Sequence, residues 1–122
     1  SAIFLAATYP DRIGALLLDS PFADAPSLIQ RLNGPPLAAE AISGFKDNID
    51  RMHDISQHCL IIHGTRDWII PISDAEALYE ACPSRKKKLV KIDGAGHNDL
   101  IIRDIETYFA EIRAWVDSIR EE

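Results

Sequence analysis

The chain has 122 residues, of which 47% are hydrophobic and 26% are charged. This composition is typical of one compact soluble domain and excludes disordered and fibrous proteins. The 19 acidic residues outnumber the 13 basic ones and give a formal charge of -6, so nucleic acid and anionic membranes are electrostatically poor partners. No apolar run reaches the roughly 20 residues of a membrane span, and no signal-peptide pattern opens the chain. We therefore expect a cytoplasmic protein with no nucleic-acid partner and no membrane span.

The first half of the chain predicts a helix, a buried strand and an irregular segment. The alanine-rich stretch 1–9 ends before Pro10 and is typical of the end of a helix. An almost unbroken apolar run at 13–18 predicts a strand that is buried on both faces of a parallel sheet. Residues 25–57 are rich in proline and glycine, with a short helical stretch at 37–42. Such a segment forms either a cap over an active site or a plain surface connection.

The second half alternates strands with helices. Residues 59–62 and 89–92 predict two further buried strands. Between them, Ser73 and Glu76 have the spacing of a capping box, which predicts a helix that runs from there to about Ala81. Apolar residues recur three or four positions apart over 101–119 and predict one long amphipathic helix. The fold class is therefore α/β, a three-layer sandwich with about three parallel strands and flanking helices.

Three polar residues directly follow the three predicted strands: Asp19, Asp67 and His97. Ligands bind beyond the carboxyl ends of the strands in open α/β sheets. The spacing from Asp67 to His97 is that of one helix and one strand, so we expect the two side chains to meet. A carboxylate then fixes the imidazole tautomer, and the other ring nitrogen accepts a proton from a nucleophile. Taken singly, Asp67 is also a plausible turn former and His97 a plausible helix cap.

The surroundings of these two residues resemble the α/β-hydrolase superfamily. The strand followed by His-Gly-Thr-Arg-Asp at 63–67 is similar to its acid-bearing turn, and Gly-Ala-Gly-His-Asn-Asp at 94–99 is similar to its histidine loop. Acid before histidine is also the chain order of that fold. The nearest group is that of cytosolic serine hydrolases such as acyl-protein thioesterases and serine aminopeptidase-like enzymes. The resemblance covers nearly the whole chain and is weakest over 25–57.

The resemblance implies a function and a division of the chain. Asp67 would be the acid and His97 the base of a Ser-His-Asp triad that hydrolyses an ester, thioester or amide of a small-molecule or acyl substrate, with no cofactor and no metal. Residues 1–24 would hold the end of the helix after the nucleophile elbow and the first strand, 25–57 a cap-like segment, and 58–122 the acid and histidine strands with the last helix.

The nucleophile elbow of the superfamily, G-x-S-x-G, does not occur in the 122 residues. In relatives a small residue such as Ser1 or Ala2 directly follows the elbow, which would place the nucleophile about three residues before Ser1. We therefore expect the C-terminal half of an α/β-hydrolase that is inactive alone. Because its first strand would lack a neighbour, we also expect a homo-oligomer or association with a separate N-terminal half.

Two functions of other kinds remain open. One is a non-catalytic fragment or interaction module that self-associates through an exposed sheet edge. The other is a small flavodoxin-like or receiver-like domain, although no phosphate-binding glycine loop follows the first strand.

Several other side chains have less specific expectations. Cys59 and Cys82 lack the spacing of a metal or redox site, so we expect two buried thiols. His63 is expected to be a packed, hydrogen-bonded imidazole, and His53 and His58 are expected at the surface. For Trp68, next to the acid, both an acyl-pocket wall and packing against the neighbouring loop are open.

Overall fold

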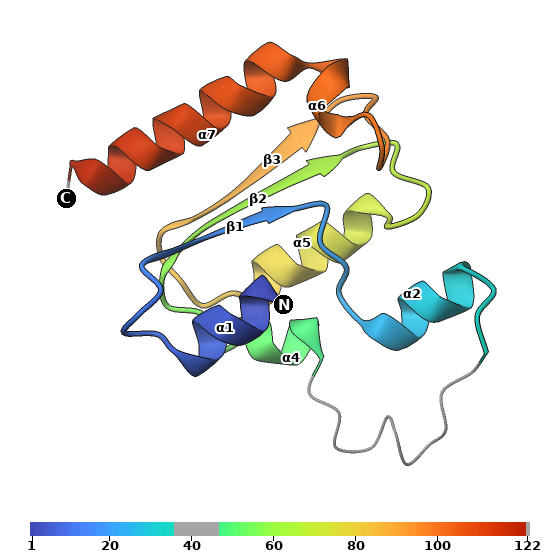
Figure 1. Ribbon diagram of the computed structural model, residues 1–122, viewed down its shortest axis with the longest axis horizontal. Helices are drawn as coiled ribbons and strands as arrows, with labels where there is room; N and C mark the ends of the chain where they lie inside the picture. The colour runs from blue at the N-terminus through green and yellow to red at the C-terminus, as the bar shows by residue number, and fades with distance from the viewer. Residues whose placement is uncertain (36–46, 122) are drawn as a thin grey trace.

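The computed structural model describes residues 1–35 and 47–121, so the helical stretch expected at 37–42 lies outside the described residues. Three parallel strands form a sheet in the order β1-β2-β3. Their bounds are β1 Ala15–Asp19, β2 His58–Gly64 and β3 Lys87–Ile92. In the register, Leu16 pairs with Cys59, and Ile61 pairs with Leu89. The expected α/β fold with parallel strands and flanking helices is confirmed (Figure 1).

The central strand β2 is buried on both faces because its alternate side chains enter two separate cores. Cys59 and Ile61 pack against α1 (Ala2–Thr8), α4 (Asn48–Met52) and α5 (Ile72–Ala81) on one face. Leu60 and Ile62 pack beneath α7 (Ile105–Arg120) on the other face. Figure 1 shows α7 on one side of the sheet and α1, α4 and α5 on the other. Each fully buried leucine or isoleucine of this kind contributes about 1.5–3 kcal/mol to folding.

The two cysteines lie in the first of these cores. Cys59 and Cys82 are both buried and both free, as expected. The hydrogen bond with the Cys82 thiol and, after it, burial raise the pKa of Cys59.

The start of α5 differs from the predicted capping box. The helix begins at Ile72, its N-cap residue is Pro71, and no side chain makes a capping hydrogen bond there. Ser73 therefore lies inside the first turn. Pro71 takes the extended backbone of an N-cap (φ -62, ψ 151) and thus moves the helix start upstream of Ser73. The predicted end is correct: α5 stops at Ala81, where Cys82 is extended before Pro83.

The predicted single C-terminal helix is two helices, α6 (Leu100–Arg103) and α7. The break falls at Asp104, whose backbone is not helical (φ -151, ψ 73) and whose carboxylate accepts a hydrogen bond from Thr107 N. Aspartate favours this N-cap arrangement over the helix interior because its short side chain competes for backbone N–H groups. Hydrogen bonds from the side chain and the backbone N–H of Thr107 lower the pKa of Asp104. None of the helices in the described part of the chain is long and apolar enough to cross a membrane.

Candidate active site

Asp67 and His97 lie in the loops that leave the carboxyl ends of the neighbouring strands β2 and β3. His97 Nδ1 is 2.9 Å from Asp67 Oδ2. The Asp67 side chain is fully buried, whereas that of His97 is 32% exposed. An ionised carboxylate only accepts hydrogen bonds, so Nδ1–H of the imidazole donates to it. In the neutral form of such a ring the other nitrogen, Nε2, carries no proton and is able to accept one.

The turn after β2 holds the second oxygen of Asp67. Ile69 N and Ile70 N both donate to Asp67 Oδ1, at 3.0 and 2.8 Å. Asp67 is therefore a turn former and the partner of His97 at the same time, with one oxygen for each role. This arrangement prevents the carboxylate from rotating freely and keeps Oδ2 directed at the imidazole.

His63 supports the same turn from inside the fold. Its side chain is fully buried, as expected, and its Nε2 lies 2.7 Å from Ile70 O, to which Nε2–H donates. The same nitrogen is 3.6 Å from Asp67 Oδ2. Its Nδ1 has no hydrogen-bond partner among the described residues. His63 thus packs against the acid without taking part in the pair.

The loop after β2 (residues 65–71, the acid loop) and the loop after β3 (residues 93–99, the histidine loop) are joined by a backbone–backbone hydrogen bond and by a hydrogen bond to the Thr65 side chain. Arg66 N donates to Ala95 O at 2.9 Å, and Gly94 N donates to Thr65 Oγ1 at 2.8 Å. The loops approach so closely that a Cβ atom on Gly64 would lie 2.1 Å from Ala95 O. Only glycine fits at that position, so the two loops form one unit.

The histidine loop is also closed at its own end. Asp99 precedes α6 but makes no capping hydrogen bond to that helix. Its carboxylate instead accepts a hydrogen bond from Gly96 N, next to His97. The loop is thereby held on both sides of the imidazole, which faces Asp67 rather than capping the helix.

Asp19, the third predicted strand-end residue, has hydrogen-bond partners other than Asp67 and His97. Its two oxygens accept hydrogen bonds from Ser20 Oγ and Tyr108 OH, each at 2.8 Å. Burial and the hydrogen bond to Asp19 raise the pKa of Tyr108 to about 12. Asp19 and His97 nevertheless line the same depression of about 300 Å³, whose other walls are Asn98, Leu100, Ile101 and Ile102. Ser20 has φ 53, a left-handed backbone that the sequence did not reveal.

Of the remaining expectations for histidine and tryptophan side chains, some are confirmed and others are wrong. His53 is exposed, as expected, whereas His58 is half-buried. Trp68 is 87% exposed, so the expectation that it packs against the neighbouring loop is wrong. No group of three or more His, Cys, Asp or Glu that could hold a metal occurs among residues 1–35 and 47–121.

The parallel sheet with helices on both faces and an aspartate and a histidine at neighbouring strand ends is the arrangement of part of an α/β-hydrolase fold. Solved structures agree on the fold. Est1E from Butyrivibrio proteoclasticus superposes with a TM-score of 0.81 at 20% identity, over 99% of this chain and 57% of that one. A monoacylglycerol lipase from Paleococcus ferrophilus gives a TM-score of 0.71 at 18% identity, over 96% and 63%.

The sequence defines the family more narrowly. Residues 22–106 match the family described as serine aminopeptidase, S33, and the chain belongs to that family of α/β-hydrolases. Alpha/beta hydrolase domain-containing protein 17C from Xenopus tropicalis is 43% identical over 53 residues, which are 43% of this chain and 17% of the relative. Protein 17B from Homo sapiens is 45% identical over 53 residues, or 43% and 18%. The chain thus matches a minor part of these curated relatives and little more than half of the solved structures.

Proposed function

We propose that the chain supplies the acid and the base of a serine hydrolase that cleaves an ester, thioester or amide bond. The observation that carries the proposal is the 2.9 Å contact between Asp67 Oδ2 and His97 Nδ1 at neighbouring strand ends. In this mechanism Asp67 orients His97 and stabilises its protonated form. Nε2 of His97 removes the proton from a serine hydroxyl and later returns it to the leaving group.

The nucleophile of this hydrolase would come from outside the 122 residues, because G-x-S-x-G does not occur in them. The names of the structural neighbours, among them a monoacylglycerol lipase and a phospholipase A, favour a carboxylic ester as substrate. The apolar walls that Leu100, Ile101 and Ile102 give the depression beside His97 suit an acyl chain. The family match favours this hydrolase over a non-catalytic interaction module.

The proposal is tested with a fluorophosphonate probe, which reacts with serines that a histidine activates. A longer protein that contains these residues and a G-x-S-x-G elbow is expected to be labelled, and His97→Ala is expected to slow labelling by about 10³-fold or more. The 122-residue chain alone is expected to give no burst with p-nitrophenyl acetate. His53→Ala is the matched control, because His53 is exposed, and it should label normally. Equal labelling of the His97→Ala variant would refute the proposal, as would a stoichiometric burst from the isolated chain that Ser1→Ala abolishes.

We also propose that β1 recruits another strand, from a second copy or from a separate N-terminal half. β1 is an edge strand in the described part of the chain, and its backbone groups on the outer side are available for pairing. Leu17 on this strand is 37% exposed, and Ile105 and Phe109 of α7 are 54% and 53% exposed. Covering such apolar surface stabilises an assembly by about 25 cal/mol for each Å² removed from water.

Light scattering at micromolar concentration is expected to give a mass well above the 13.6 kDa of one chain. Leu17→Lys places a charge on the exposed edge and is expected to shift the population toward monomer, since edge lysines oppose strand pairing. Leu32→Lys, a similar change at a residue that is 58% exposed and lies outside the strand, serves as the control. A stable monomer of the unchanged chain contradicts the proposal.

A further inference from the structure

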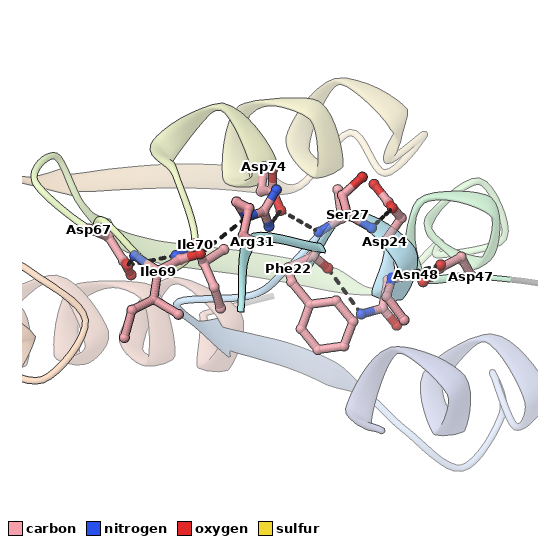
Figure 2. Close-up of polar contacts among 12 residues, drawn as sticks. Phe22, Asp24, Ser27, Arg31, Asp47, Asn48, Asp67, Ile69, Ile70 and Asp74 are labelled. Atoms are coloured by element: carbon pink, nitrogen blue, oxygen red, sulfur yellow. Dashed lines mark hydrogen bonds and ion pairs between the residues drawn. The ribbon is translucent and has the colours of Figure 1, made fainter. Parts of the chain in front are cut away.

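One side chain connects helix α2 (Ala25–Arg31) to the loop that carries Asp67. Arg31, the last residue of that helix, donates from Nε to Ile69 O at 3.2 Å and from Nη2 to Asp74 Oδ2 at 3.0 Å. Figure 2 shows the guanidinium between the acid loop and the start of α5. Its planar fork thus binds a backbone carbonyl and a carboxylate at the same time, which suits the fixed geometry of its donors.

Both ends of this bridge are fixed. The Asp74 side chain is 12% exposed, and its Oδ2 also accepts a hydrogen bond from Ala23 N at 3.0 Å. Helix α2, which carries Arg31, is held at its own first turn, where the N-cap residue Asp24 accepts a hydrogen bond from Ser27 N at 2.7 Å (Figure 2). The guanidinium is therefore held by partners that are themselves anchored.

The carbonyl that Arg31 binds belongs to the peptide group between Ile69 and Ile70. The N–H of that same planar group is Ile70 N, which donates to Asp67 Oδ1 at 2.8 Å. The carbonyl and the N–H of a trans peptide point in opposite directions and rotate together. A hydrogen bond on one side thus fixes the direction of the other and strengthens it by polarisation.

We propose that Arg31 is a positioning residue for the triad acid. By holding the Ile69–Ile70 peptide group, Arg31 keeps Oδ1 of Asp67 engaged with the turn and leaves Oδ2 facing His97. Arg31 itself touches no reacting atom. The inference rests on the proposed function, because this geometry affects the reaction only if Asp67 and His97 are the acid and base. It also gives helix α2 an indirect part in placing Asp67, since a displacement of α2 would reach the carboxylate through this peptide group.

The test measures the Nδ1 proton of His97 by NMR in the 122-residue chain. A proton shared with a carboxylate resonates far downfield, and its exchange rate with water reports how well the contact is held. Arg31→Met is expected to raise that rate at least about tenfold, as the loss of one hydrogen bond from a charged group would do. Arg31→Lys keeps the charge beside Asp74 but lacks the Nε donor to Ile69. We therefore expect it to restore stability toward the unchanged chain while exchange stays fast.

Arg120→Met is the matched control, because Arg120 is exposed in the last turn of α7, away from the carboxyl ends of the strands (Figure 1). This variant should leave the exchange rate of the His97 Nδ1 proton unchanged. Slow exchange in folded Arg31→Met would overturn the role of Arg31, and so would a Lys variant that restores slow exchange together with stability. The Lys variant carries the test if the Met variant does not fold. A chain with no downfield Nδ1 signal at all would instead overturn the Asp67–His97 pair and with it the proposed function.

Discussion

Asp67→Asn is expected to lower kcat of the hydrolase proposed above by about 10⁴-fold, the scale of such a change in other triads, and to leave KM nearly unchanged. The geometry gives the reason. Two backbone N–H groups, from Ile69 and Ile70, require an acceptor at the position of Oδ1. The amide oxygen of asparagine therefore takes that position, and its NH₂ group faces His97. Nδ1 must then accept a hydrogen bond, the ring proton moves to Nε2, and the base can no longer take a proton from serine.

The measurement is steady-state hydrolysis of an activated ester, together with loss of the downfield Nδ1 signal in the 122-residue chain. Asp93→Asn is the matched control, because Asp93 is an exposed aspartate that follows the neighbouring strand β3. We expect it to keep normal activity. Retention of kcat within about tenfold in Asp67→Asn, against the 10⁴-fold expected of a triad acid, would exclude Asp67 from that role.

Gly64→Ala is expected to destabilise the fold by about 3 kcal/mol or more, at the upper end of overpacking costs. The added Cβ would lie 2.1 Å from Ala95 O. That oxygen belongs to the backbone and accepts a hydrogen bond from Arg66 N at 2.9 Å, so it cannot move away without separating the two loops. A thermal melt should show a decrease in Tm on the order of 10 °C.

Gly14→Ala is the control, since a Cβ at Gly14 meets nothing within 4 Å. It is expected to be neutral or slightly stabilising, because alanine restricts the unfolded chain more than glycine does. Equal Tm values for the two variants would show that the two loops can move apart without loss of stability, against this prediction.

The sheet and the acid–histidine pair were predictable because their signals are local. Apolar runs followed by polar residues mark buried strands and their carboxyl ends, and parallel strands bring those ends to one edge. That pattern places Asp19, Asp67 and His97 at strand ends, and the resemblance of the surrounding motifs to the α/β-hydrolases singled out the Asp67–His97 pair. Helix ends were less predictable: the serine of an apparent capping box lies inside α5 because Pro71 takes the N-cap position, and Asp104 interrupts an otherwise regular apolar stripe.

The contacts that hold the acid in place were not predictable in the same way. Arg31 and Ile69 are 38 residues apart in sequence, and their hydrogen bond involves a backbone carbonyl that no residue type marks. The exposure of Trp68 likewise depends on the course of a loop rather than on the apolar character of the side chain. Sequence patterns therefore identified the chemical groups, whereas their orientation came from long-range packing.

The joined loops after β2 and β3 bear on whether the residues of a triad can come from two separate polypeptides. Carboxylate and imidazole are brought together by hydrogen bonds that run between these two loops, and Arg31 of α2 supports the first loop from outside. The aspartate–histidine contact therefore forms entirely within this chain. Under the proposed function, the pair needs a serine hydroxyl within hydrogen-bonding distance of Nε2 of His97. A serine delivered by a different polypeptide satisfies that requirement as well as one earlier in the same chain, so a hydrolase of this design is open to being split into two complementary halves.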